Sequence, residues 1–349
     1  MLSPADRFSY ALRQSARIAW YMGHYFASQR FRARPADETE EHRPRRQGGL
    51  SRETILAAMG RLFARDLANV ERGFYPMPRD RDGDLRGLIE SSRRYFADLP
   101  VAAERKQSRR ADEVATQVTD STAIDYPDYF LQNFHYQTGG YLTEQSAKLY
   151  DMQVEVLFSG TANAMRRQSL VPIAQFLKGK DQRKLKLLDV GCGTGRFLRA
   201  VKEAFPRLGI TGADLSPNYL QEARGHLKPY KITTEVAAAE ALPFSDASFD
   251  IVSSTYLFHE LPPEIRRAAA RQFARVLKPG GLFVFMDSLQ LGDLPSYDSL
   301  LESFPDNFHE PYYASYIAED LRTVFTDAGL EFISTEPIFL SKMMVCRKG

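Results

Sequence analysis

The stretch LKLLDVGCGTGRFL, from Leu185 to Leu198, constrains the fold more than any other part of the chain. An apolar run ends in Asp189, and three glycines then alternate with other residues before a helix-like pattern begins. Because glycine has no Cβ, a turn rich in glycine lets the backbone approach a bound molecule closely. The stretch therefore predicts a buried strand, a loop that holds a nucleotide-like ligand, and a helix.

After Val171 the sequence alternates between strand-like and helix-like segments. The expected strands are Leu185–Val190, Gly209–Asp214, Ile232–Ala237, Phe249–Ser254, Leu282–Asp287, Glu331–Glu336 and Phe339–Arg347. The expected helices are Gly195–Ala204, one opened by Ser216–Pro217, Pro263–Leu277 and Glu319–Ala328. Strands joined through helices need right-handed crossovers, which predicts an α/β fold with a doubly wound, mostly parallel sheet. The short junction at Pro337 predicts that the last two strands form an antiparallel hairpin at one edge.

Three parts of the chain are expected from these patterns. Residues 1–50 read as an N-terminal helix and a flexible charged linker, the linker covering residues 33–51. Residues 51–170 read as a helical, aromatic-rich region that caps the substrate, with a helix that Ser51 begins and another over Leu85–Phe96. Residues 171–349 form the ligand-binding domain, with a lid insertion at about 288–316.

The first thirty residues allow three interpretations. Arg13, Arg17 and Arg30 surround an aromatic stretch, and acids are nearly absent. A helix packed on the body of the protein, peripheral membrane contact through residues 10–31, and a transit peptide all fit this composition. The sequence leaves the three open.

Composition excludes several functional classes. The net charge of +2 indicates no strong field for nucleic acid, and the arginine pairs Arg93–Arg94, Arg109–Arg110 and Arg166–Arg167 are typical of solvated helix faces. Two distant cysteines, Cys192 and Cys346, form neither a disulfide framework nor a zinc motif, so no metal is expected. The absence of a long apolar run and the sparse cysteines favour a cytoplasmic protein, with membrane association or organellar import left open.

The spacing of the glycine loop indicates which ligand it holds. A dinucleotide fingerprint reads GxGxxG and cradles a pyrophosphate, whereas this loop reads GxGxG. Asp189 directly before the loop would repel a pyrophosphate and attract an ammonium group. Asp214 ends the second expected strand, where a carboxylate accepts both ribose hydroxyls. These features together favour S-adenosyl-L-methionine over NAD.

At this point the sequence resembles a known family. LLDVGCGTGRFL, GADLSPNYL, EALPFSDASFDIV and RVLKPGGLFVFMDS are similar to successive motifs of class I S-adenosylmethionine-dependent methyltransferases of the small-molecule type. The resemblance implies the seven-stranded methyltransferase sheet and a site built from conserved motif positions. The cofactor-binding residues that it implies are Asp189, Gly191, Cys192, Gly193, Gly195, Asp214, Leu215, Ala239, Glu240 and Ser254. Ala238 stands where the family often has an acid for the adenine amino group, so either Glu240 or a backbone carbonyl replaces this acid or the adenine is held less tightly.

The methyl acceptor should meet residues at the end of the fourth expected strand and in the lid. His259 is the candidate general base, and Glu260 orients it or lines the cleft; the alternative is that His259 packs and Glu260 opens a helix. His309 is a second catalytic candidate. Further substrate-lining candidates are His135, Tyr136, Glu310, Tyr312 and Tyr313, although the lid residues could instead form an aromatic clasp with solvated charges. The aromatic content favours a small apolar or aromatic metabolite as acceptor, methylated on oxygen or carbon.

Other functions remain as alternatives. Amino-group methyltransferases of DNA carry an NPPY-like tetrad where this chain has TYLFHE, and cytosine chemistry needs a cysteine there. An RNA or protein methyltransferase, a dinucleotide oxidoreductase, and a catalytically silent S-adenosylmethionine-binding protein also stay open. The oligomeric state cannot be read from the sequence.

Overall fold

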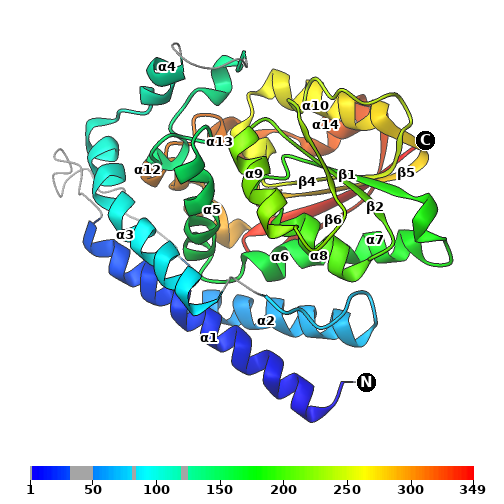
Figure 1. Cartoon of the computed structure of the whole chain (residues 1–349), viewed down its shortest axis with the longest axis horizontal. Helices are drawn as coiled ribbons and strands as arrows, with labels where there is room; N and C mark the ends of the chain where they lie inside the picture. Colours follow the sequence, from blue (N-terminus) through cyan, green and yellow to red (C-terminus); the bar gives the residue numbers. More distant parts are fainter. Residues whose placement is uncertain (1, 32–49, 81–83, 119–124) are drawn as a thin grey trace.

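A computed structural model describes residues 2–31, 50–80, 84–118 and 125–349 of the protein. Most of the linker predicted for residues 33–51 lies outside these ranges. The structure has a mixed sheet at one end and a layer of helices at the other (Figure 1). The expectation of an α/β fold with a helical N-terminal extension is confirmed.

The sheet contains seven strands in the order β3-β2-β1-β4-β5-β7-β6. The strands are β1 (Lys186–Val190), β2 (Gly209–Asp214), β3 (Thr233–Val236), β4 (Phe249–Thr255), β5 (Leu277–Ser288), β6 (Leu330–Ile338) and β7 (Ser341–Lys348). The pairs among β1 to β5 are parallel, while β7 runs antiparallel between β5 and β6. The predicted doubly wound sheet and the predicted antiparallel hairpin at its edge are therefore both confirmed.

One strand is longer than the sequence indicated. β5 starts at Leu277, which pairs with Phe249, and the register then shifts before Ile251 pairs with Leu282. The segment Lys278-Pro279-Gly280-Gly281, which follows the predicted helix Pro263–Leu277, is therefore a bulge at the start of the strand. Glycine at a bulge supplies the backbone freedom that the extra residues need, and Gly280 has a φ of +71°.

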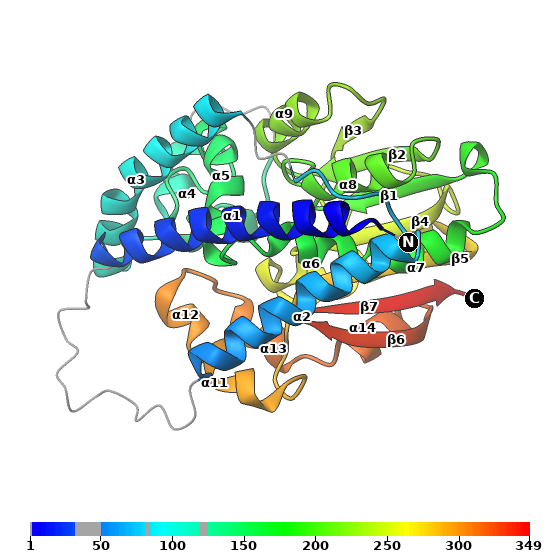
Figure 2. The same cartoon turned by 90° about the horizontal axis from the view of Figure 1, so that it is seen from below.

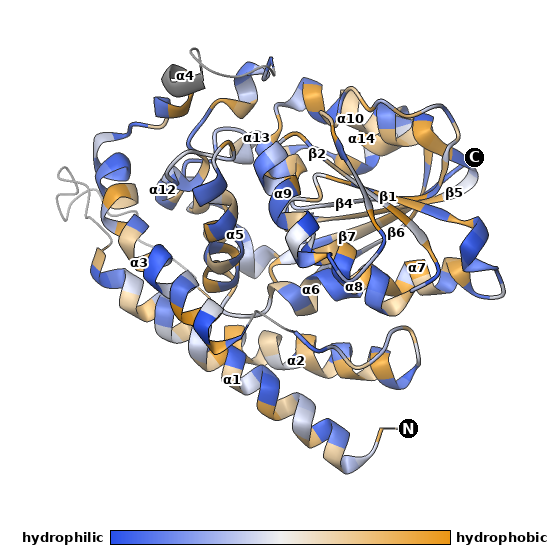
Figure 3. Cartoon of the chain, in the orientation of Figure 1, coloured by the Kyte–Doolittle hydropathy of each residue, from blue (hydrophilic) through white to orange (hydrophobic). Residues whose placement is uncertain are grey.

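Helices cover both faces of the sheet. These helices are α6 (Ala162–Gln168), α7 (Leu170–Leu177), α8 (Arg196–Ala204), α9 (Pro217–His226), α10 (Pro263–Val276) and α14 (Leu321–Asp327). One apolar core joins the sheet to α10 and α14, and a second joins its other face to α7, α8 and α9. The apolar strands at the centre of this sandwich stand out in Figure 3.

The N-terminal layer consists of four longer helices and the short α4. These are α1 (Pro4–Ser28), α2 (Arg52–Glu71), α3 (Leu85–Ser108), α4 (Glu113–Val118) and α5 (Glu144–Leu157). Ser51 caps α2 through its side chain, as predicted. Figure 2 shows α1 lying along the length of the molecule. Helices α1 and α3 both pack against α5, which connects this layer to the rest of the protein.

Helix α1 docks mainly through polar side chains as far as Arg17, whereas Tyr21 packs in an apolar cluster with Tyr95. Its buried positions include Tyr10, Gln14 and Arg17, whereas Phe8 and Leu12 are exposed. Packing on the body of the protein is thus the arrangement that the structure has, and contact with lipid stays a prediction. Among the helices of the described ranges, none has the length and apolar character that crossing a bilayer requires.

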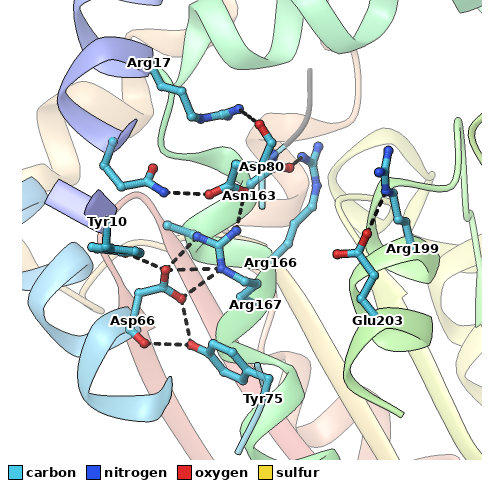
Figure 4. A network of polar contacts seen from close by, with 12 residues as sticks. Tyr10, Arg17, Asp66, Tyr75, Asp80, Asn163, Arg166, Arg167, Arg199 and Glu203 are labelled. Atoms are coloured by element: carbon cyan, nitrogen blue, oxygen red, sulfur yellow. Dashed lines mark hydrogen bonds and ion pairs between the residues drawn. The ribbon is translucent and has the colours of Figure 1, made fainter. Parts of the chain in front are cut away.

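The reason for this polar docking is a buried ionic network (Figure 4). Arg167 lies between Asp66 and Asp80, with Nη2 2.6 Å from Asp66 Oδ2 and Nη1 2.5 Å from Asp80 Oδ1. Tyr10 of α1 donates to Asp66 at 2.6 Å, and Tyr75 donates to the same carboxylate at 2.7 Å. The interpretation of Arg166–Arg167 as a solvated face is wrong, because Arg167 is only 5% exposed and its charge is paired internally.

The segment predicted as a lid, 288–316, is largely helical. It contains η7 (Pro295–Tyr297), α11 (Asp298–Glu302) and α12 (Phe304–Asn307), followed by α13 (Tyr313–Ala318). Helix α12 lies near the ends of α3 and α5 in the view of Figure 1. Short turns in the aromatic segment, η3 (Asp128–Phe130) and η4 (Phe134–Tyr136), complete the chain around the site, together with η6 (Phe258–Glu260) after β4.

Candidate active site

The glycine loop after β1 has the geometry that its sequence predicted. Gly191, Gly193 and Gly195 all have positive φ, at +71°, +53° and +79°. A Cβ on Gly195 would come within 2.8 Å of Leu227, so glycine is needed there for the loop to close against α9. A Cβ on Gly193 would meet only the Tyr150 ring, at 4.0 Å. Gly193 therefore presents bare backbone to open space beside the loop.

A cleft of about 690 Å³ opens above this loop at the carboxyl ends of the parallel strands. Its walls combine backbone from the loop with acids and many aromatic rings. The lining residues are Tyr129, Phe130, Phe134, Tyr141, Tyr150, Gly191, Gly193, Asp214, Leu215, Tyr219, Ala237, Ala239, Tyr256, Leu257, Glu260 and Leu261. The open sheet edge and the first loop are where α/β proteins of this kind bind their ligands.

Two carboxylates lie at the ends of neighbouring strands, and one of them, Asp214, lines the cleft. Asp214, at the end of β2, accepts from the backbone N–H of Gly193 at 2.8 Å and of Ser216 at 2.9 Å. Asp189, at the end of β1, accepts from Ser253 Oγ at 2.8 Å. Burial raises the pKa of Asp189 to about 7, and the nearby Asp214 adds to this effect. A cationic group at this position would restore the ionised form of Asp189.

Some of the other residues predicted to bind the cofactor line the cleft, and others do not. Leu215 and Ala239 line the cleft, whereas the Cys192 side chain packs beside Gly212 of β2 and Gly195 caps α8. Glu240 accepts a hydrogen bond from the Tyr129 hydroxyl at 2.8 Å, which brings it to the rim of the cleft. Ser254 is buried, and its Oγ has no hydrogen-bond partner within the described residues.

His259 is held by an acid that the sequence analysis did not identify. Its Nδ1 lies 2.5 Å from Oδ1 of Asp287, the penultimate residue of β5, and Asp287 Oδ2 also accepts from the Phe258 N–H. Burial lowers the pKa of His259, but the carboxylates around the ring, Asp287 most of all and then Glu260 and Glu310, together outweigh burial and raise this pKa to about 10. The ring is thus protonated at neutral pH, and Asp287 fixes its orientation. The sequence feature that could have identified Asp287 is its position as an acid at the end of an apolar strand, in FMDS.

Glu260 faces the cleft beside this pair. Its Oε1 lies 3.8 Å from His259 Nε2 and accepts from the Tyr141 hydroxyl at 2.5 Å. Burial and the neighbouring Glu310 raise the pKa of Glu260 to about 7, although His259 opposes them. Glu260 therefore lines the cleft, one of the two roles expected for it, while Asp287 orients His259.

The lid residues close the site against the aromatic segment. His309 Nε2 and the Tyr312 hydroxyl both hydrogen bond the side chain of Gln132, at 2.8 and 3.0 Å. The carbonyl of His309 accepts from the His135 N–H, and the rings of Tyr136 and His309 lie 5.6 Å apart. His309 thus forms part of a clasp and does not lie with His259.

Two further lid residues point inward. Tyr313 donates to or accepts from Ser288 Oγ at 2.8 Å, and its ring lies 6.2 Å from that of His259. Glu310 is buried, and its Oε1 lies 2.9 Å from His135 Nε2. The expectation that lid charges are solvated is therefore wrong for Glu310. Burial lowers the pKa of His135, and the Glu310 carboxylate more than compensates and raises it.

A second cavity lies on the other side of Tyr150. It is a partly open cavity of about 1060 Å³ between α1, α3 and α5. Most of its lining is apolar or aromatic, with Tyr25, Phe31, Tyr95, Leu99, Ala102, Tyr136, Val154, Leu157 and Phe308 among the wall residues. Tyr150 lines both this cavity and the cleft, and His135 lines the second cavity. This cavity is larger and more apolar than the cleft over the glycine loop.

Comparisons with known proteins find methyltransferases. Residues 187–281 match a family model described as a methyltransferase domain. Over 139 residues the chain is 31% identical to a ubiquinone/menaquinone biosynthesis C-methyltransferase of Desulfotalea psychrophila, which covers 40% of this chain and 53% of that protein. It is 33% identical over 158 residues to an O-methyltransferase of Penicillium expansum, covering 44% of this chain and 54% of the relative. The chain thus spans about half the length of the curated relatives that it matches.

Solved structures give weaker similarities. The PH0226 protein of Pyrococcus horikoshii aligns with a TM-score of 0.40 and 19% identity, over 53% of this chain and 90% of that one. The [4+2]-cyclase SpnF aligns with a TM-score of 0.40 and 18% identity, over 52% of this chain and 81% of that one.

Proposed function

We propose that this chain, which contains a class I S-adenosylmethionine-dependent methyltransferase domain, methylates a small apolar or aromatic metabolite on oxygen or carbon. The observation that supports this most is the pairing of two sites across Tyr150. One is a polar cleft on the glycine loop, and the other is a larger apolar cavity. Cofactor and acceptor would then meet at the end of β4.

The cleft fits S-adenosyl-L-methionine, the cofactor of this family. Bare backbone at Gly193, an ionisable carboxyl at Asp189 and the unpartnered Ser254 Oγ are the features that such a ligand would engage. Asp214 still has lone pairs for ribose hydroxyls, since each of its oxygens accepts one backbone N–H. When bound, the cofactor supplies an electrophilic methyl group on a positively charged sulfur. The Tyr141, Tyr150 and Tyr219 rings would stabilise that charge through cation–π attraction.

His259 and Asp287 would handle the proton of the acceptor. Asp287 holds Nδ1, so Nε2 is the ring nitrogen left on the side of Glu260 and the cleft. A protonated Nε2 would donate a hydrogen bond to an acceptor oxygen and stabilise its anion, while a neutral one would remove the proton. Both roles require the same placement, and the catalytic assignment of His259 stays a proposal.

The second cavity would bind the body of the acceptor. Aromatic and aliphatic walls exclude water and favour an apolar molecule. Relatives of this domain include one named for quinone C-methylation and one named as an O-methyltransferase, and an acceptor with a hydroxylated ring would suit either reaction. A long nucleic acid or a folded protein fits an internal cavity of this kind less well than a metabolite.

The decisive experiment combines binding and turnover. Calorimetry with S-adenosyl-L-methionine should show one site per chain, and incubation with hydroxylated quinones and phenols should release S-adenosylhomocysteine with transfer of a labelled methyl group. No cofactor binding would refute the proposal. Binding without turnover on extracts fractionated for apolar metabolites would favour the silent binding protein.

A cavity-filling variant tests the acceptor site separately. Ala102→Trp, which fills the second cavity from α3, should raise the KM for the acceptor and leave cofactor affinity unchanged. Ala57→Trp, on the exposed face of α2, is the matched control. Equal acceptor KM values in the two variants would exclude this cavity as the binding site.

A further inference from the structure

Three side chains from separate segments converge beside the cleft with their polar atoms together. They are His135 of η4, Glu260 of η6 and Glu310 of the lid, and one ligand atom from each lies within 4.8 Å of the others. We propose that these residues bind a divalent first-row metal ion that prefers nitrogen and oxygen ligands, such as Mn²⁺, Fe²⁺ or Zn²⁺. The proposal differs from the expectation that no metal is bound, which considered cysteine motifs and not the folded arrangement.

Glu310 is the residue that most needs a cation. It is 3% exposed, and neither carboxylate oxygen receives a hydrogen bond from the described residues. Its ion-pair partner among the described residues is His135, whose Nε2 lies 2.9 Å away without hydrogen-bond geometry. A buried carboxylate without donors is costly unless a cation compensates it. A metal ion between the two residues would satisfy both oxygens and the imidazole nitrogen.

Glu260 adds a second carboxylate to the same point. Tyr141 donates to its Oε1, so Oε2 remains available for a further contact. The neighbouring His259 charge is already matched by Asp287 and does not neutralise both glutamates. One histidine and two carboxylates form the donor set of many Mn²⁺, Fe²⁺ and Zn²⁺ sites.

The backbone holds the ligands near the required separation. Metal–ligand bonds of about 2.0–2.2 Å place any two ligand atoms at most about 4.4 Å apart, so the cluster needs to contract only slightly. His135 and Tyr136 have φ values of +55° and +57°, in the left-handed region that residues other than glycine rarely adopt. The His135 N–H bond to the His309 carbonyl fixes this strained turn against the lid. Strain of this kind is typical of residues whose side chain must point to a functional position.

The site lies where the two cavities meet. His135 lines the apolar cavity, and Glu260 lines the cleft over the glycine loop. Three protein ligands leave coordination positions open, and an acceptor oxygen could occupy one of them. A metal ion there would lower the pKa of an acceptor hydroxyl and hold its oxygen toward the methyl group. This role depends on the proposed function, whereas binding of the metal does not.

The test measures metal directly, without turnover. Full-length protein stripped with a chelator is titrated with Mn²⁺ and followed by electron paramagnetic resonance. We expect one tightly bound Mn²⁺ per chain and electron spin echo modulation from an imidazole nitrogen. Glu310→Gln should weaken Mn²⁺ binding at least tenfold, and His135→Gln should remove the nitrogen modulation. Glu104→Gln, an exposed acid on α3, is the matched control and should bind as the unchanged protein does.

Several outcomes would overturn the proposal. They are the absence of stoichiometric Mn²⁺ and Zn²⁺ binding, bound Mn²⁺ without nitrogen modulation in the unchanged protein, or equal affinity in Glu310→Gln and Glu104→Gln. The first two outcomes are measured on the unchanged protein alone. The test therefore still holds if a variant fails to fold. Metal binding with no affinity for S-adenosyl-L-methionine would refute the proposed function and leave the metal site in place.

Discussion

Replacing Asp189 by asparagine should abolish the pH dependence of S-adenosylhomocysteine binding between about pH 6 and pH 8. In the ligand-free protein, burial raises the pKa of Asp189 to about 7. The ligand's ammonium group favours the ionised carboxylate, so binding should release a proton whenever Asp189 starts protonated. Affinity should therefore rise with pH through the pKa of the free protein and level off above it.

The magnitude follows from the fraction of ionised Asp189. With a pKa of about 7, about one chain in eleven carries the carboxylate at about pH 6, and about ten in eleven carry it at about pH 8. Affinity should thus change about tenfold across this range, or about 1.4 kcal/mol. The asparagine variant should bind with constant affinity, weaker than the unchanged protein at about pH 8 by the roughly 1.5–3 kcal/mol of a charged hydrogen bond.

Calorimetry in buffers with different ionisation enthalpies measures both the affinity and the proton release. S-adenosylhomocysteine is the better ligand because it lacks the sulfonium charge, which would also act on Glu260, another carboxyl with a pKa of about 7. Unfolding curves at each pH check that the protein stays folded. A tenfold pH dependence that persists in Asp189→Asn would refute the assignment to Asp189, and so would a flat profile in the unchanged protein.

Three other substitutions test separate parts of the structure. Asp214→Ala should weaken S-adenosyl-L-methionine binding by at least one charged hydrogen bond, about 1.5–3 kcal/mol, and unchanged affinity in calorimetry would contradict the ribose assignment. Gly195→Ala forces a Cβ to within 2.8 Å of Leu227 at positive φ, and should cost about 1–3 kcal/mol of unfolding free energy in urea; a neutral effect would show that the loop can relax. Asp66→Ala leaves Arg167 without one of its two carboxylate partners and should cost about 3–5 kcal/mol, whereas an unfolding midpoint equal to that of the unchanged protein would exclude a structural role for the network.

Local patterns carried most of the fold prediction. Glycine spacing, a strand run that ends in an acid, and a serine–proline helix start are all properties of a few adjacent residues. These features placed the loop after β1, the carboxylate Asp214 and the start of α9 correctly. The predicted start of β5 was wrong because the bulge depends on pairing with β4, and the local sequence does not encode this pairing.

The chemistry beyond the cofactor could be predicted less well. His259 was selected from its place after β4, but its orienting partner Asp287 comes from the next strand and is adjacent only in the folded sheet. The burial of Glu310 and of Arg167 also depends on partners far along the chain. Burial of an unpaired charge is costly, so a charged residue is predicted to be exposed to solvent unless its partner is known.

The electrostatics of the cleft bear on the oxidoreductase alternative. Asp214 and Glu260 line the cleft together with many aromatic rings, and Asp189 lies at the end of the neighbouring strand β1. A dinucleotide pyrophosphate brings two negative charges and needs backbone N–H groups that are free to bind it. Here the Gly193 N–H already donates to Asp214. The carboxylates and ring faces would attract the ammonium group and the sulfonium of S-adenosyl-L-methionine. The same groups would repel a pyrophosphate. The charge of the site therefore discriminates between two nucleotide ligands that the fold alone would accept equally.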